Sequence, residues 1–319
     1  MTPQKSTGGV APTLTGEDLV RTVPSLSEVC KLEVNSYSTK PGASLKMADL
    51  LRIAELVDSA LEAGTTGVVI VQGTDTIEET SYLFDLVVRS SKPVVVMGAM
   101  RNPSLPGADG PANILAAATV ASSPLSVGRG TMVVLNDEIN AARRVQKSDT
   151  SCVGSFASPG WGPLGRVVEG KVIFSAPPSR TAPISPVSYT APTEKWPVAL
   201  IKAGLDDDGR LLKELPRLGY KGVIVEAMGA GHLPSHYSEI VSEILTVMPV
   251  VLATRVPSGS IFTRSYSFPG SEMDLLGRGA WSAGFLRSPQ ARILLTLLLA
   301  NGLQGRELQN EFLARAEEP

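Results

Sequence analysis

Apolar residues in this chain follow two patterns that alternate along its length. Short uninterrupted apolar runs, typical of buried strands, occur at residues 68–71, 93–97, 131–135, 198–202, 222–225 and 249–253. Between them, apolar residues recur at helical spacing, which predicts helices at residues 49–63, 80–90, 110–121, 210–218 and 235–246. This alternation predicts an α/β fold whose sheets are mostly parallel and flanked by helices.

A change of composition divides the chain into two parts. Residues 174–196 are rich in proline, serine and threonine and show no helical period, which is typical of a linker. We therefore expect a larger N-terminal α/β domain over residues 1–180, a linker over residues 181–196 and a smaller C-terminal α/β domain over residues 197–319.

The strand at residues 68–71 leads directly into a Gly-Thr-Asp-Thr turn and then into an acidic, helix-like segment. Ligands of parallel α/β sheets bind beyond the carboxyl ends of the strands, where a helix N-terminus offers free N–H groups. This turn thus places two hydroxyls and a carboxylate, those of Thr74, Thr76 and Asp75, where such folds usually bind substrate. Taken alone, the same residues also suit a simple helix cap, and the local pattern leaves both interpretations open.

Charge and composition exclude several classes of function. The chain has 319 residues and a net charge of −2, which gives no electrostatic reason to expect binding to nucleic acid or to an anionic membrane. Cys30 and Cys152 have no metal-ligand spacing and form no disulfide framework. His232 and His236 have the spacing of helical zinc ligands, but a proline lies between them, so we expect no metal site. The longest apolar run near the C-terminus, residues 293–300, is too short to span a bilayer and predicts a buried helix.

Several motifs in a fixed order resemble one enzyme family. The motifs are Gly73-Thr-Asp-Thr-Ile-Glu-Glu-Thr80, Gly98-Ala-Met-Arg101, Ala108-Asp-Gly-Pro-Ala-Asn113, Val145-Gln-Lys-Ser-Asp-Thr150, Gly162-Pro-Leu-Gly165 and Arg255-Val-Pro-Ser-Gly259. Together they resemble the bacterial-type L-asparaginase/glutaminase family, and the resemblance extends over nearly the whole chain. It implies a two-domain α/β amidohydrolase that releases ammonia from the side-chain amide of L-asparagine through a threonine nucleophile and an acyl-enzyme.

The resemblance also implies roles for individual residues. In this family two threonines share the work, one in the Gly-Gly-Thr turn of the first strand and one in the Gly-Thr-Asp-Thr turn. Thr74 matches the second threonine, Lys147 the lysine close to it, and Asp75 the carboxylate that binds the α-amino group of the substrate. Independently, an amine beside a hydroxyl can accept its proton and make it a stronger nucleophile, so the three residues would supply nucleophile, base and orienting group. The positions implied to bind substrate are Gly42, Ala43, Thr74, Asp75, Ala99 and Glu272, with Glu272 reaching the site of a neighbouring subunit. From the residues alone, Lys147 also suits a solvated surface, Asp75 a helix cap and Glu272 a solvated loop. The resemblance further implies no metal or organic cofactor, an amino-acid amide as substrate, a homodimer or homotetramer, and a cytoplasmic location.

Two departures from the family pattern affect the expected activity. Family members begin with a strand that ends in a Gly-Gly-Thr nucleophile turn, whereas Val10 follows the glycines of Thr7-Gly-Gly-Val-Ala11. We expect that this strand is missing from the chain, and loss of the first nucleophile in the protein itself is the alternative. Where family members carry Ser-Gln for the substrate carboxylate, this chain has Gly42 and Ala43, so asparagine or glutamine preference stays open. A non-catalytic amino-acid-binding or sensor protein on the same scaffold is the alternative function.

Overall fold

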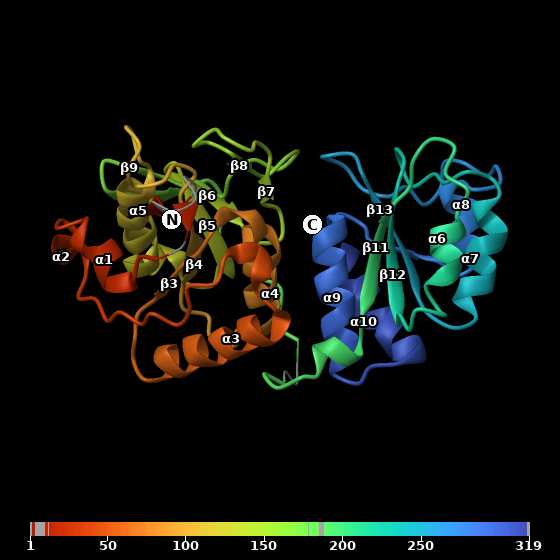
Figure 1. The fold of residues 1–319 in the computed structure, drawn as a ribbon, viewed down its shortest axis with the longest axis horizontal. Coiled ribbons are helices and arrows are strands. Elements are labelled where there is room, and N and C mark those ends of the chain that lie inside the picture. Colours follow the sequence, from red (N-terminus) through yellow and green to blue (C-terminus); the bar gives the residue numbers. More distant parts are fainter. Residues whose placement is uncertain (1, 4–9, 12, 178, 185–187, 318–319) are drawn as a thin grey trace. The chain divides into compact units, whose positions relative to one another are not determined.

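A computed structural model describes residues 2–3, 10–11, 13–177, 179–184 and 188–317 of the chain (Figure 1). The chain divides into two compact units, residues 1–183 and 184–319, each with a sheet of its own. The sheet of the first unit has six strands and that of the second has four. This mixed α/β architecture confirms the expected fold class.

The first unit is built on a six-stranded sheet with the strand order β10-β9-β6-β5-β4-β3. Its strands are β3 (Val68–Val71), β4 (Val94–Met97), β5 (Thr131–Leu135), β6 (Glu138–Ala141), β9 (Gly165–Val168) and β10 (Lys171–Phe174). The pairs β3–β4 and β4–β5 are parallel and the remaining three pairs are antiparallel, so β3, β4, β5 and β9 run in one direction. Every residue of β4 and β5 is buried, because helices cover both faces of the parallel half.

Helices α4 and α5 lie on opposite sides of this sheet (Figure 1). The helices of the first unit are α1 (Gly16–Arg21), α2 (Leu26–Val29), α3 (Met47–Glu62), α4 (Ile77–Val87) and α5 (Gly110–Ser122). The alanine-rich helix α5 packs on the face that carries Val95, Met97, Met132 and Val134, and α2 covers α5 from outside. On the other face, α3 packs against α4.

Short elements complete the first unit. They are the strands β1 (Thr2–Pro3), β2 (Val10–Ala11), β7 (Gln146–Lys147) and β8 (Phe156–Ala157), and the 3-10 turns η1 (Gly42–Ser44), η2 (Thr74–Thr76) and η3 (Pro124–Ser126). β1 pairs with β2, and β7 pairs with β8, in two antiparallel ladders outside the main sheet.

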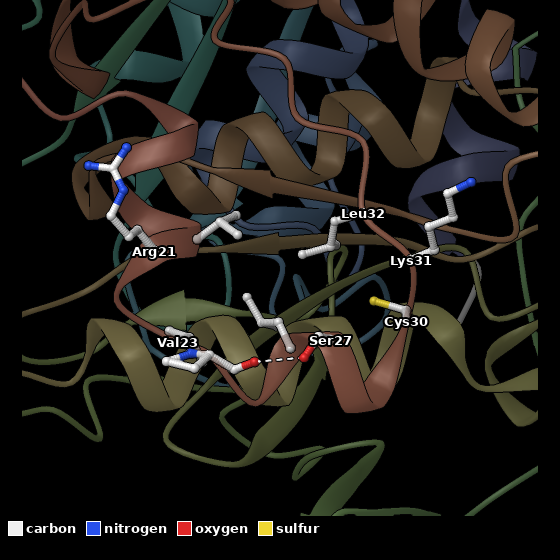
Figure 2. A pocket seen from close by; sticks show the side chains of 9 residues that line it. Arg21, Val23, Ser27, Cys30, Lys31 and Leu32 are labelled. Atoms are coloured by element: carbon white, nitrogen blue, oxygen red, sulfur yellow. Dashed lines mark hydrogen bonds between the residues drawn. The ribbon is translucent and has the colours of Figure 1, made fainter.

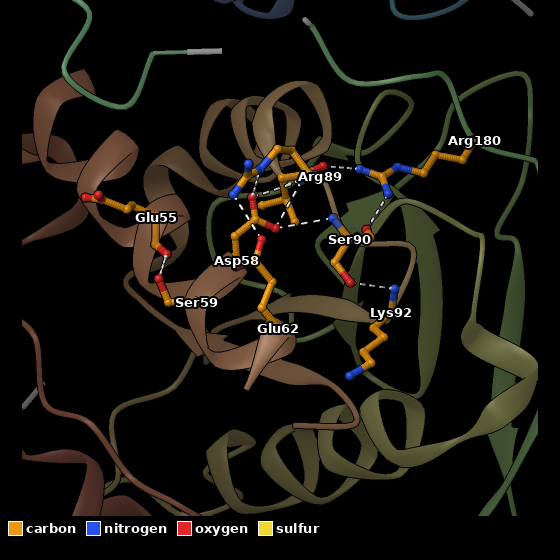
Figure 3. A network of polar contacts seen from close by, with 9 residues as sticks. Glu55, Asp58, Ser59, Glu62, Arg89, Ser90, Lys92 and Arg180 are labelled. Carbon is orange, nitrogen blue, oxygen red and sulfur yellow. Dashed lines mark hydrogen bonds and ion pairs between the residues drawn. The ribbon is translucent and has the colours of Figure 1, made fainter. Parts of the chain in front are cut away.

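Polar contacts fix the chain at the C-terminal end of α4 (Figure 3). Asp58 on α3 is only 1% exposed, and its carboxylate accepts the N–H groups of Arg89 and Ser90 at 3.0–3.2 Å. The guanidinium of Arg180 donates to the carbonyl groups of Val88 and Ser90. These contacts satisfy the backbone between α4 and β4, so the C-terminal end of the helix that follows η2 is fixed.

The second unit is a four-stranded parallel sheet in the order β11-β12-β13-β14. Its elements are η4 (Thr193–Lys195), β11 (Val198–Lys202), α6 (Arg210–Glu214), β12 (Gly222–Ala227), α7 (Tyr237–Leu245), β13 (Val250–Thr254), α8 (Glu272–Gly277), β14 (Trp281–Ser282), α9 (Ser288–Ala300) and α10 (Gly305–Glu317). Helices α6, α7 and α8 lie on one side of the sheet and α9 and α10 on the other (Figure 1). The buried apolar helix α9 confirms the interpretation of residues 293–300, and no helix in the described chain is both long and apolar enough to cross a bilayer.

The structure confirms the strands that were predicted from apolar runs. It also contains β-hairpins that the sequence pattern did not predict. Residues 68–71, 131–135 and 198–202 form strands with the expected bounds. The sequence pattern did not indicate β6 to β10, because these strands have only two to four residues each and are partly exposed, so they carry no continuous apolar run. Helix α4 begins at Ile77, three residues before the predicted start, since η2 runs directly into it.

Candidate active site

The Gly-Thr-Asp-Thr turn lies between the carboxyl end of β3 and the N-terminus of α4. Gln72 still donates its backbone N–H to Met97 at 3.1 Å, and the chain then turns through η2 into α4. Thr74 is buried to 9% exposure, whereas the Asp75 side chain is 67% exposed. Helix α4 has Thr76 as its N-cap residue, and Thr76 makes no side-chain capping bond. The turn is therefore not a simple helix cap, and Thr74 and Asp75 are available for other contacts.

Lys147 contacts both Thr74 and Asp75. Its Nζ lies 2.9 Å from Thr74 Oγ1 and 2.8 Å from Asp75 Oδ1. The Lys147 side chain is only 18% exposed, so it is not a solvated surface lysine. The three residues that the sequence predicted to be catalytic are thus within hydrogen-bonding distance, although 72 residues or more separate Lys147 from the turn.

The β7–β8 hairpin presents Lys147 to the turn. Lys147 pairs with Phe156 in the ladder, and both the N–H and the hydroxyl of Ser148 donate to the carbonyl of Ser155 at 2.6 and 2.9 Å. In the loop between the strands, Asp149 accepts the N–H groups of Ser151 and Cys152. These bonds lower the pKa of Asp149, because they stabilise its carboxylate form. The hairpin is therefore an ordered support for the lysine.

The turn η1, which contains Gly42 and Ala43, packs against η2. This contact is required if the two residues are to bind the same substrate as Thr74 and Asp75. A Cβ atom at Gly42 would lie 3.0 Å from Thr76 Oγ1 and 3.1 Å from the carbonyl oxygen of Gly73. Gly42 is buried and Ala43 is exposed. The close approach explains glycine at position 42, because a side chain there would press on the η2 turn.

The loop after β4 lies against Thr74 and includes the predicted residue Ala99. A Cβ atom at Gly98 would lie 2.9 Å from Thr74 Cγ2 and 2.8 Å from the carbonyl oxygen of Gln72. Gly98 is buried and Ala99 is exposed. The carboxyl ends of β3 and β4 thus bring two loops together, as expected of neighbouring parallel strands.

Sequence reasoning missed two side chains that hold this loop. Asp109 accepts the N–H groups of Met100 and Arg101 at 2.9 and 2.8 Å, and the amide of Asn113 donates to the carbonyl of Gly98 at 3.0 Å. A signal was present, because Asn113 is a polar residue in an apolar, alanine-rich helix. Buried amides in such places need hydrogen-bond partners.

Glu272, the remaining predicted substrate ligand, lies in the second unit in a cluster of its own. Its side chain is fully buried, and Oε1 accepts the N–H groups of Ser265 and Tyr266 at 3.0 and 2.7 Å. Oε2 lies 3.2 Å from Nε2 of His232, whose ring contacts Tyr266 and Phe268 edge-on. Burial alone would raise the pKa of Glu272, but these hydrogen bonds outweigh it and lower the pKa.

The second histidine has a different partner. His236 Nε2 lies 2.9 Å from the carbonyl oxygen of Asp207, so the two histidines contact different groups. Among the described residues, no group of three or more side chains has the geometry of a metal site.

A surface pocket of about 560 Å³ is lined by side chains from residues 20–32, on and around α1 and α2 (Figure 2). Its wall includes Arg21, Val23, Ser27, Cys30, Lys31 and Leu32. It shares no lining residue with the contact between Thr74 and Lys147. Partial burial raises the pKa of the Cys30 thiol.

Comparisons with known proteins agree with this geometry. Residues 1–180 match the family model "Asparaginase, N-terminal", and residues 197–312 match "Glutaminase/Asparaginase C-terminal domain". The chain is 31% identical over 298 residues to a probable periplasmic L-asparaginase of Haemophilus influenzae, with 93% of this chain and 83% of the relative covered. It is equally similar to L-asparaginase 2 of Escherichia coli, of which 84% is covered. The crystal structure of a probable cytoplasmic L-asparaginase from Campylobacter jejuni superposes with a TM-score of 0.85, at 31% identity and 93% coverage of both chains.

Proposed function

The chain belongs to the asparaginase family and is an L-asparaginase-like amidohydrolase, and from this we propose that it converts L-asparagine into L-aspartate and ammonia. The observation that carries the proposal is the 2.9 Å contact between Lys147 Nζ and Thr74 Oγ1. A hydroxyl alone is a weak nucleophile, and an amine in direct contact can remove its proton during attack.

In the proposed reaction Thr74 is the nucleophile, because valine and not threonine follows the glycines of Thr7-Gly-Gly-Val-Ala11. Lys147 Nζ accepts the proton of Thr74 while Oγ1 attacks the amide carbon. The tetrahedral intermediate collapses when its nitrogen takes that proton back from Lys147 and leaves as ammonia. An ester between Thr74 and the β-carboxyl group of aspartate remains. Water then attacks the ester, Lys147 accepts a proton from it, and release of aspartate returns that proton to Thr74.

Substrate binding is proposed to use groups around the same turn. Asp75, with two thirds of its side chain exposed, offers a carboxylate to the α-ammonium group of the substrate. Backbone groups of Gly42 and Ala43 on η1 offer hydrogen bonds to the α-carboxylate, since neither residue has a polar side chain. Ala99, an exposed residue next to the buried Gly98 that packs on Thr74, completes the proposed site.

We further propose that the active form is a homodimer or homotetramer located in the cytoplasm. Exposed large apolar side chains surround the Glu272 cluster, which suits burial against a second copy. They are Phe262, Tyr266, Phe268 and Met273, each 41–46% exposed. Light scattering of the purified protein tests the assembly, and a monomer at micromolar concentration would contradict it.

Ammonia release from L-asparagine by the purified chain tests the proposed function. We expect Thr74→Val to abolish release, and mass spectrometry to find the acyl group on a peptide that contains Thr74. Thr80→Val is the matched control, because Thr80 is a fully buried threonine of α4 whose hydroxyl has no hydrogen-bond partner in the described chain. Asparagine binding without ammonia release would favour the amino-acid-binding or sensor alternative.

A further inference from the structure

We infer that Asn113 is a positioning residue that fixes Thr74 and the Gly98–Arg101 loop for the proposed amide hydrolysis. The inference rests on the proposed function and extends it to a side chain in the first turn of α5. Asn113 is only 2% exposed. It therefore acts through its protein contacts rather than by touching substrate.

The Asn113 amide contacts the loop after β4, the residue that precedes α5 and the turn after β5. Its Nδ2 donates to the carbonyl of Gly98 at 3.0 Å and to Asp109 Oδ2 at 3.0 Å. Its Oδ1 accepts the N–H of Asn136 at 2.9 Å. Both protons and the oxygen are used, so only an amide supplies this combination of donors and acceptor.

Together, Asn113 and Asp109 determine where the loop runs. Asn113 holds Gly98 through its carbonyl, and Asp109 holds the N–H groups of Met100 and Arg101. Ala99 lies between these fixed points and is exposed. The network thus anchors the loop on both sides of the residue that is proposed to face substrate.

The position of Gly98 controls the position of Thr74. A Cβ at Gly98 would lie 2.9 Å from Thr74 Cγ2 and 3.2 Å from Ile77 Cδ1, so the loop backbone packs directly on the threonine methyl. If Gly98 moved away from Thr74, the threonine methyl would lose this packing contact. If Gly98 moved closer, it would push the methyl out of place. Either change rotates Oγ1 away from Lys147 Nζ, which is 2.9 Å from it.

The third bond reaches the support of Lys147. Asn136, whose N–H bonds to Asn113, adopts a left-handed conformation with φ of 52° in the β5–β6 turn. Its side chain faces Gly154 in the loop of the β7–β8 hairpin, where a Cβ atom would lie 3.3 Å from Asn136 Nδ2. One buried amide therefore contacts the supports of both the proposed nucleophile and the proposed base.

Asn113→Asp tests the inference, because aspartate has the same shape but loses both donors at neutral pH. Its carboxylate faces the carbonyl of Gly98 and the carboxylate of Asp109. We expect kcat for asparagine to fall about 10- to 100-fold while KM changes less, because small misplacements of reacting groups cost this much. The kcat ratio of variant to wild type should rise as pH falls from 8 to 5, because protonation of the new carboxyl restores one donor.

Asn140→Asp is the matched control. Asn140 is fully buried in β6, its Oδ1 accepts Ser158, and its Nδ2 has no partner among the described residues. The same substitution there removes no hydrogen bond to the loop, so we expect a similar loss of stability and a kcat within about 3-fold of wild type. A kcat for Asn113→Asp no lower than for Asn140→Asp, or a ratio that does not change with pH, would overturn the inference.

Hydrogen–deuterium exchange measures the positioning without turnover. We expect the amides of Met100 and Arg101 to exchange at least about 10-fold faster in Asn113→Asp than in wild type, because their acceptor Asp109 loses its partner. If the wild-type chain hydrolyses no amide, the proposed function fails and exchange alone decides the positioning role. Unchanged exchange in the variant would then refute it.

Discussion

Asp75 and Glu272 are both carboxylates that the sequence assigned to substrate binding, and their surroundings differ sharply. The Asp75 side chain is 67% exposed and has Lys147 beside it, whereas Glu272 is fully buried. Glu272 accepts two backbone N–H groups and contacts His232, so its oxygens are already occupied. Asp75 contacts Lys147 through Oδ1, and the solvent-exposed part of its carboxylate can still bind a ligand.

The difference shows how burial separates binding from stability. A carboxylate whose hydrogen bonds are satisfied inside the protein stabilises a loop, because removing it leaves buried N–H groups without partners. A carboxylate that faces solvent, as Asp75 does beside Thr74 and Lys147, can recognise an ammonium group. We therefore expect substitutions at the two clusters to affect different quantities, and the following experiments test that expectation.

The largest effect is expected from Lys147→Met. This substitution keeps a flexible unbranched side chain but removes the amine that contacts Thr74, so we expect kcat to fall about 10²- to 10⁴-fold with the fold retained. Ammonia release and circular dichroism measure the two properties. Lys202→Met is the control, because Lys202 forms a similar 3.0 Å ion pair with Glu226 in the second unit. Near-wild-type turnover in Lys147→Met would refute the role of this lysine as the base.

Glu272→Gln is expected to change stability rather than turnover. The substitution replaces a buried charged acceptor, so we expect a loss of about 1–3 kcal/mol in the free energy of unfolding at pH 7. Because folding lowers the pKa of Glu272, its contribution is complete above the unfolded value of about 4.3 and is lost as pH falls through the folded value. Urea unfolding between pH 7 and pH 3 should therefore show a weaker acid dependence in the variant.

The same variant decides whether Glu272 also reaches substrate. With a purely stabilising role, KM for asparagine stays within about 3-fold of wild type, because the amide of glutamine still accepts the two backbone N–H groups. A KM that rises 10-fold or more while stability is unchanged would support the substrate-binding role that the sequence predicts for Glu272. The contrast between the two carboxylates would then be wrong.

Asp75→Asn is expected to weaken recognition of the α-ammonium group. We expect about a 10-fold loss of kcat/KM for asparagine, since exposure of the side chain to solvent limits the strength of the ion pair. Succinamate, which is asparagine without the amino group, is the internal control. The preference for asparagine over succinamate should fall by the same factor, and an unchanged preference would mean that Asp75 does not bind the ammonium.

Gly42→Ala is expected to have the smallest effect. Its Cβ would lie 3.0 Å from Thr76 Oγ1, so η1 must move by a few tenths of an ångström. Because backbone groups of η1 are proposed to hold the α-carboxylate, we expect KM to rise about 2- to 5-fold with kcat unchanged. Gly204→Ala is the control, because a Cβ there meets nothing within 4 Å. Equal KM values for the two variants would remove η1 from the proposed site.

Much of the fold was predictable because buried parallel strands have a strong local pattern. The runs at β3, β5 and β11 are continuous and apolar, and their bounds were predicted correctly. The hairpin that carries Lys147 has only two paired residues in each strand, too few for an apolar or alternating pattern. No local pattern indicates such a hairpin, so Lys147 was identified only through the resemblance of its motif.

The sequence by itself determined the α/β class, the strand that leads into the Gly-Thr-Asp-Thr turn, and the candidate residues Thr74, Asp75 and Lys147. Tertiary structure alone decided that Lys147 lies 2.9 Å from Thr74, that Asn113 joins three segments, and that Glu272 is enclosed by its own loop. The physical reason is that apolar periodicity is a local property of a segment. The environment of a polar side chain depends on which distant segments fold against it.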